Sequence, residues 1–157
     1  MTSGNGEPFY ENLTEGGKFR SKVGRTVTEV DNMWFTLLSM DRNPIHFNLD
    51  YMQKNYSGDP FNGRLVFNGI GTMAIANGLT NEYTSAKGFI LSIDGVKFKK
   101  PVFPEDTIYA EVEVVERRLS KSKPDFGIVK TVTRGFNQYG NEVIEFYKTF
   151  MVPRKNR

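Results

Sequence analysis

A continuous apolar stretch near the middle of the chain is its most distinctive hydropathy pattern. It runs from Leu65 to Leu79, LVFNGIGTMAIANGL, and its apolar positions do not keep to one side of a helical wheel. A helix that is apolar nearly all round is buried, and this one is too short to span a membrane. Its three glycines each weaken an isolated helix by about 1 kcal/mol relative to alanine. We therefore expect a core helix that other structure encloses.

Four segments with the pattern of strands follow the apolar stretch. They are Phe89–Lys99, Thr107–Arg117, Gly127–Asn137 and Glu142–Pro153. Alternating apolar positions, clearest in the second and fourth segments, predict one buried face for each strand. Because short turns connect the strands in succession, we expect an antiparallel sheet. A sheet curled around one apolar helix is an α+β fold.

The first half of the chain predicts an extended segment and two helices. We expect an extended Lys18–Thr26, a helix over Asp31–Met40 after capping patterns such as Thr28-x-x-Asp31, and a shorter helix over Leu49–Tyr56 with Asn48 as its N-cap. In the first helix, apolar residues recur at spacings of three and four, which predicts a buried face. These residues are Val30, Met33, Trp34, Leu37 and Leu38. We interpret Trp34 as a core anchor.

Composition indicates one globular domain, residues 8–157, after an N-terminal tail of residues 1–7. The absence of cysteine excludes disulfides, thiolate catalysis and cysteine zinc sites. A net charge of +3 suits an anionic small molecule, but basic residues alternate with acidic ones, which is typical of a solvated surface and not of a nucleic-acid interface. The N-terminus lacks a signal-peptide pattern, so we expect a cytoplasmic protein with no membrane segment.

Candidate chemistry lies in the segment Asp41-Arg42-Asn43-Pro44-Ile45-His46. Pro44 ends the preceding helix and imposes a turn, and His46 is the only histidine of the chain. A histidine near a carboxylate moves protons near neutral pH, which makes Asp41 and His46 a candidate catalytic pair. The alternative is structural, with Asp41 capping the turn. One histidine excludes a histidine-rich metal site.

A second candidate lies at the start of the core helix. The backbone amide of Gly69 is free there to meet an anion or a polarised carbonyl. Gly69-x-Gly71-x-x-Ala74 also imitates a dinucleotide-binding fingerprint. We discount that interpretation because antiparallel hairpins follow it, and not βαβ units.

Three motifs together resemble a known family. They are Asp41-x-Asn43-Pro44-Ile45-His46-Phe47-Asn48, Phe61-Asn62-Gly63-Arg64-Leu65-Val66-x-Asn68-Gly69 and Lys100-Pro101-Val102-Phe103-Pro104-x-Asp106. These resemble the MaoC-like, R-specific enoyl-CoA hydratases of the hot-dog fold, over residues 8 to 153. The segments 34–38 and 150–154 further resemble the branch that includes mesaconyl-CoA hydratase and methylmalyl-CoA dehydratase.

The resemblance implies a hot-dog fold and a hydro-lyase that adds water reversibly across the double bond of a 2-enoyl-CoA. Asp41 and His46 would be catalytic, and the Gly69 amide would polarise the thioester carbonyl. Asn68 and Asn77 would bind substrate, although many members have histidine and serine at these positions, which affects the acyl groups accepted. The resemblance further implies an acyl-CoA substrate, no metal or redox cofactor, and a homodimer or higher homo-oligomer.

Two other functions stay open at this point. A hot-dog thioesterase would release the CoA thiol without hydration. A noncatalytic acyl-CoA-binding module would keep the fold and bind ligand without turnover.

Overall fold

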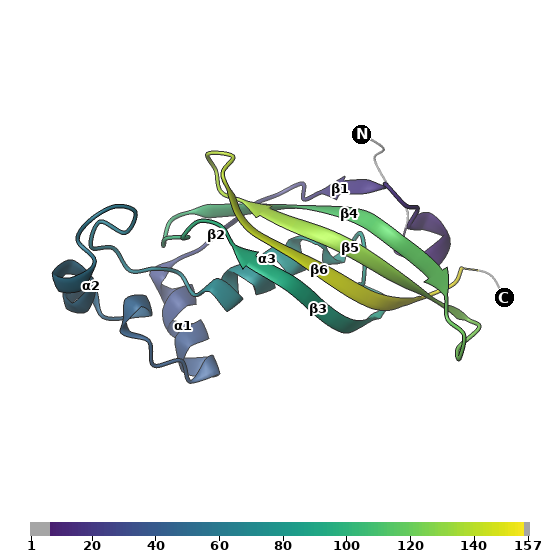
Figure 1. The fold of residues 1–157 in the computed structure, drawn as a ribbon, viewed down its shortest axis with the longest axis horizontal. Coiled ribbons are helices and arrows are strands. Elements are labelled where there is room, and N and C mark those ends of the chain that lie inside the picture. Colours follow the sequence, from purple (N-terminus) through teal and green to yellow (C-terminus); the bar gives the residue numbers. More distant parts are fainter. Residues whose placement is uncertain (1–6, 156–157) are drawn as a thin grey trace.

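The computed structural model describes residues 7–155. The N-terminal tail that the sequence predicts lies, except for Glu7, outside this range. A long antiparallel sheet forms one layer and the helix α3 lies along its inner face (Figure 1). The shorter helices α1 and α2 project beyond one end of the sheet, opposite the end where the two termini lie.

The sheet has the strand order β1-β4-β5-β6-β3, and β2 pairs separately with β4. All pairings are antiparallel. The strands are β1 Lys18–Arg20, β2 Arg25–Thr26, β3 Phe89–Phe98, β4 Thr107–Leu119, β5 Phe126–Phe136 and β6 Glu142–Pro153. The four predicted long strands are confirmed to within two residues at each end, and the predicted extended segment at the N-terminus is divided into β1 and β2.

The helices are α1 Glu29–Ser39, α2 Leu49–Asn55 and α3 Gly69–Asn81, with single 3-10 turns at Tyr10–Asn12 and Pro44–His46. Asn48 caps α2 by accepting a hydrogen bond from the Tyr51 amide (2.9 Å), as predicted. Thr28 and Asp31 form the predicted capping box at the start of α1. Local sequence signals therefore set where both helices begin.

The core lies between α3 and the inner face of the sheet. The alternating apolar residues of β4 and β6 are fully buried, including Ile108, Ile144 and Phe146. They pack with Val27, Phe67, Ala76 and other residues of one cluster. Period-two alternation in these strands therefore predicted the buried face correctly.

The core helix begins at Gly69, as predicted, and differs from its prediction in burial. Before it, Val66 and Phe67 donate backbone hydrogen bonds to Ile45 (3.0 Å) and Val102 (2.7 Å). The helix is buried on one side only, since Ile70 is 52% exposed on the other. Within residues 7–155, nothing covers the outer face of α3 at Ile70.

The predicted buried face of α1 is wrong for this chain. Trp34 is 70% exposed, so it is not a core anchor, and Leu37 and Leu38 are exposed as well. The residues that α1 buries are Asn32 and Thr36. The reason is geometric: α1 lies beyond the end of the sheet (Figure 1), so its apolar face is left exposed in the part of the chain that the structure describes.

No helix among residues 7–155 has the length and apolar character required to cross a membrane.

Candidate active site

Asp41 lies directly after α1, where the chain turns sharply. Met40 takes a left-handed conformation (φ 55°) and ends the helix, and the Asp41 amide donates to the Thr36 carbonyl (3.1 Å). One carboxylate oxygen, Oδ1, accepts a hydrogen bond from the Asn43 amide (2.9 Å). The other oxygen, Oδ2, faces His46. The capping role that the sequence left open for Asp41 thus uses only one of its two oxygens.

His46 sits in the 3-10 turn that follows Pro44, and its ring is buried. Its Nδ1 lies 2.8 Å from the Val66 carbonyl oxygen. Because a carbonyl only accepts hydrogen bonds, Nδ1 carries a hydrogen and Nε2 of the neutral ring is an acceptor. Nε2 lies 3.6 Å from Asp41 Oδ2, which is too long for a direct hydrogen bond. Two proton acceptors therefore face one another across a narrow gap.

Asn68 links this pair to the start of α3. Its Nδ2 donates to Asp41 Oδ2 (2.8 Å). Its Oδ1 caps the helix by accepting from the Ile70 and Gly71 amides (2.9 and 3.3 Å). Asn68 is only 4% exposed. The same side chain thus fixes both the helix terminus and the carboxylate.

Asn32 connects the three segments that carry these groups. Its Nδ2 donates to the carbonyls of His46 (2.7 Å) and Val66 (3.0 Å), and its Oδ1 accepts from the Asn68 amide (3.1 Å). The side chain is 1% exposed and uses all of its donors. Asn32 is not among the residues that the sequence predicted for the site. The available signal was the polar pair Asn32 and Thr36, spaced by four, inside a helix that otherwise shows an apolar face.

Gly69 presents a free backbone amide beside His46. In the part of the chain that the structure describes, the Gly69 N–H has no hydrogen-bond partner. Gly69 and His46 line one pocket of about 280 Å³, which Phe98 and residues 99–102 also border. A Cβ at Gly69 would lie 2.9 Å from the Phe98 ring, so a larger residue here would require the ring to move. The pocket therefore joins the free amide to the imidazole.

A second, mostly apolar pocket of about 500 Å³ opens on the Asp41 side. Met33 and Leu37 of α1 form its wall together with Met40 and Phe47, and Asp41 and Arg42 lie at its edge. The two pockets flank the Asp41–His46 pair. An extended ligand with a polar centre and an apolar end would match this arrangement.

Comparison with known proteins shows the family. The family described as "MaoC like domain" matches residues 11–135, most of the chain. The chain belongs to the MaoC-like domain family. The predicted relationship is thus confirmed.

Two curated relatives illustrate the functions found among MaoC-like proteins. The (R)-specific enoyl-CoA hydratase of Rhodospirillum rubrum is 31% identical over 147 residues, covering 94% of this chain and 93% of the relative. The mesaconyl-CoA hydratase of Haloarcula marismortui is 25% identical over 150 residues, covering 94% of this chain but only 40% of the longer relative.

A solved structure supports the fold of this MaoC-like chain. A conserved hypothetical protein of Mycobacterium tuberculosis, described as a double hot-dog fold, matches with a TM-score of 0.80 at 19% identity. The match covers 95% of this chain and 45% of that one. The predicted hot-dog fold, a sheet around a central helix, is confirmed.

Asn77, which the sequence analysis assigned to substrate binding, lies eight residues beyond Gly69 on α3 and has a different partner. Its Oδ1 accepts a hydrogen bond from Lys148 Nζ (2.9 Å). Thr84 and Ser85 accept the other two hydrogen bonds of the ammonium group (both 3.1 Å). The structure does not bring Asn77 together with Asp41 and His46, and its role in substrate binding stays a prediction.

Lys148 is a fully buried cation in the apolar row of β6. It occupies the position between Phe146 and Phe150 that alternation reserves for an apolar side chain. Burial lowers the pKa of Lys148 from 10.5 to about 8, because the charged form loses hydration. The irregularity was visible in the sequence as a lysine in register with Ile144, Phe146, Phe150 and Val152.

We expect Asn32→Ala to destabilise the protein strongly. The substitution removes the partner of the buried Asn68 amide and of the His46 carbonyl, and each unpaired group costs about 1–3 kcal/mol. Urea unfolding should show a loss of about 2–4 kcal/mol. The matched control is Asn55→Ala, which removes one exposed hydrogen bond to Tyr51 and should cost less than about 0.5 kcal/mol. Equal losses in the two variants would contradict the bridging role of Asn32.

We expect the stability of the wild type, relative to Lys148→Met, to rise between pH 8 and pH 10.5. The pKa of Lys148 is about 8 in the folded state and near 10.5 when unfolded, so the unfolded chain binds more protons in this window. The full difference corresponds to about 3 kcal/mol. Urea unfolding of both proteins at pH 7 and pH 10 measures it. Parallel pH profiles would show that the folded-state pKa of Lys148 is not lowered.

Proposed function

We propose that this chain is an acyl-CoA hydro-lyase that adds water reversibly across the double bond of a 2-enoyl-CoA thioester. One observation carries the proposal: Asp41 Oδ2 and His46 Nε2, two proton acceptors, face each other 3.6 Å apart beside the free amide of Gly69. The family and the hydratase relative at 31% identity support the same chemistry.

The facing acceptors suit a bound water molecule. A water between them donates one hydrogen to the carboxylate and one to the imidazole, which orients its oxygen lone pairs toward substrate. The water oxygen attacks the β-carbon of the enoyl group and loses a proton to one member of the pair. The pair returns that same proton to the α-carbon, so one water is added in all, both side chains end in their starting protonation states and the thioester stays intact.

The Gly69 amide is the electrophilic element of this proposal. Attack at the β-carbon builds negative charge on the thioester oxygen, and the free N–H at the start of α3 donates to that oxygen. The amide is fixed in advance, because Asn68 caps the same helix turn. The acyl chain then extends past Asp41 into the apolar pocket formed by Met33, Leu37 and Met40.

Asn68 acts as a positioning residue in this scheme. Its amide donates to Asp41 Oδ2 and so orients the carboxylate. This differs from the substrate-binding role that the sequence analysis assigned to it. The proposed reaction uses acid–base chemistry of the chain alone, and dialysis against a chelator should leave its rate unchanged.

The experiment that tests the function follows loss of the conjugated double bond and release of free thiol at the same time. We expect crotonyl-CoA or mesaconyl-CoA to lose the double bond without thiol release. Asp41→Asn and His46→Gln should each lower kcat by about 10²–10⁴-fold, because each removes one proton-transfer group. Asp50→Asn, which changes an exposed carboxylate on α2, is the matched control and should keep full activity.

The other outcomes identify the alternatives. Thiol release without hydration would assign a thioesterase, and binding of acyl-CoA without turnover would assign a noncatalytic module. Unchanged hydration in Asp41→Asn, with the fold intact by circular dichroism, would contradict the catalytic pair.

We also propose that two copies of the chain form a homodimer through β3. This strand pairs with β6 on one side and lies at the edge of the sheet. It exposes Phe89, Ile90 and Leu91, which is unusual for an edge that faces water. The mycobacterial double hot-dog protein, of which this chain covers 45%, carries two such folds in one chain. In a homodimer, a second copy of this chain would take the place that the second hot-dog fold has in the mycobacterial protein.

Light scattering should therefore give twice the 17.9 kDa of a single chain. Leu91→Lys should produce a monomer, because a charge on the edge strand opposes pairing with another strand. Leu119→Lys, at the end of β4 and with nearly the same exposure (49% against 51%), should remain a dimer. A wild-type monomer, or a dimer that survives Leu91→Lys, would contradict pairing through β3.

A further inference from the structure

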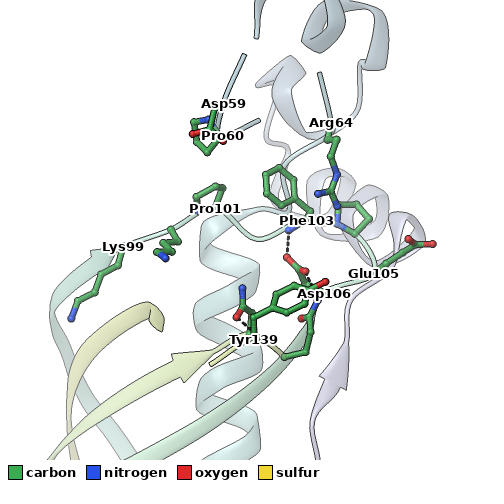
Figure 2. Close-up of a pocket in the computed structure, with 13 residues that line it drawn as sticks. Asp59, Pro60, Arg64, Lys99, Pro101, Phe103, Glu105, Asp106 and Tyr139 are labelled. Atoms are coloured by element: carbon green, nitrogen blue, oxygen red, sulfur yellow. Dashed lines mark hydrogen bonds between the residues drawn. The ribbon is translucent and has the colours of Figure 1, made fainter. Parts of the chain in front are cut away.

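A separate, larger pocket of about 700 Å³ lies outside the catalytic pair. We call it the basic pocket. Figure 2 shows it below Asp59 and Pro60, with Pro101 and Phe103 above and Tyr139 beneath. Its walls come from distant parts of the chain: the 59–64 loop, the 99–106 turn and the β5–β6 connection at 137–139.

Internal hydrogen bonds hold the floor of the basic pocket. Asp106 accepts from the Phe103 amide through Oδ2 and from Gln138 Nε2 through Oδ1, both at 2.9 Å. Gln138 Oε1 in turn accepts from the Thr107 amide (2.9 Å). Asp106 is only 8% exposed, and each of its carboxylate oxygens is occupied by one of these internal donors. The pocket is therefore built before any ligand enters.

Two cations at this pocket form no ion pair with an acidic side chain of residues 7–155. The Arg64 guanidinium stacks on the Phe103 ring at 4.1 Å and forms no ion pair within residues 7–155. Lys100 Nζ donates to the neutral amide oxygen of Asn141 (2.6 Å). Lys99 differs from both, since Glu142 neutralises it at 2.6 Å.

The acidic residues of the rim leave these cations accessible. The Glu105 side chain points away from Phe103 (Figure 2). Asp59 lies across the pocket from Arg64 (Figure 2). A site with one stacked arginine and one lysine is typical of phosphate recognition, because guanidinium and ammonium groups donate several hydrogen bonds to one anion.

The basic pocket adjoins the pocket of the candidate active site. Both are lined by Lys99, Lys100 and Pro101. Arg64 precedes Gly69 by five residues, which limits the distance between their Cα atoms to about 17 Å. An extended pantetheine arm spans a distance of this order. A thioester at Gly69 would thus place the far end of its carrier near Arg64.

We propose that the basic pocket binds the phosphorylated nucleotide of the CoA thioester, with Arg64 and Lys100 contacting its phosphates. This inference rests on the proposed function, since it names the carrier end of the same substrate. It selects free CoA over an acyl carrier protein, because the anion site is a concave pocket lined by three segments. A carrier protein would instead need an open basic surface.

The test uses adenosine 3′,5′-bisphosphate, the nucleotide of CoA without its pantetheine arm. Calorimetry should detect binding to the wild type, and Arg64→Gln and Lys100→Gln should each weaken it about tenfold, the effect of losing one charged hydrogen bond. The matched control is Lys121→Gln, which removes an exposed cation from the β4–β5 connection at the other end of the sheet and should bind normally. Circular dichroism and thermal melting confirm that each variant is folded.

Kinetics give a second measurement. The ratio of kcat/KM for crotonyl-CoA to kcat/KM for the N-acetylcysteamine thioester, which lacks the nucleotide, should fall about tenfold in Arg64→Gln and stay constant in Lys121→Gln. A nucleotide that does not bind, or that binds Arg64→Gln and Lys100→Gln as tightly as wild type, overturns the proposal. Turnover of an acyl carrier protein substrate without nucleotide binding overturns it as well.

Failure of the proposed function gives a different result. If nucleotide binding depends on Arg64 while no enoyl-CoA is hydrated, the basic pocket stands and the hydratase proposal fails. If hydration occurs without nucleotide binding, the hydratase proposal stands and the basic pocket fails.

Discussion

A single buried amide, the side chain of Asn32, determines how the candidate active site is arranged. It joins α1 to the carbonyls of His46 and Val66 and to the amide of Asn68. Because Val66 also accepts from the His46 ring, the imidazole and the helix terminus share one hydrogen-bonded frame. The sheet provides support for α3, but this frame sets the distance between the carboxylate, the imidazole and the free Gly69 amide.

The sheet could be predicted from sequence because each strand carries its own pattern. Alternation in β4 and β6 identifies a buried face without reference to any other segment, and residues such as Ile108 and Phe146 are buried as expected. The face of α1 could not be predicted in this way. Its apolar spacing is real, but spacing does not reveal whether anything covers the face, and Trp34 is left exposed. Burial of a helix depends on tertiary contacts that a periodicity does not contain.

The candidate site was predictable in its parts and not in its connections. The spacing of Asp41 and His46 around Pro44 indicated a pair, and the structure brings them to 3.6 Å. Asn68 was identified, but its partners, Asp41 and the α3 amides, depend on a fold that sequence alone does not supply. Asn32 and Lys148 went unrecognised because a polar residue inside an apolar pattern shows only that a partner exists. It does not show which one.

Residues 41–69, which include the hydrogen-bonded groups around Asn32, are not equally constrained along their length. Residues 41–46 and 66–69 are fixed by the hydrogen bonds described above, whereas α2 and the 57–64 loop between them are largely exposed. Exposed connections tolerate insertions and sequence change far better than buried ones. A lineage could therefore lengthen or reshape the Leu49–Asn62 region, and with it the nearby pocket walls, while the distances among Asp41, His46 and Gly69 stay constant. The fold thus separates the segment that is free to vary from the hydrogen-bonded frame of the candidate site.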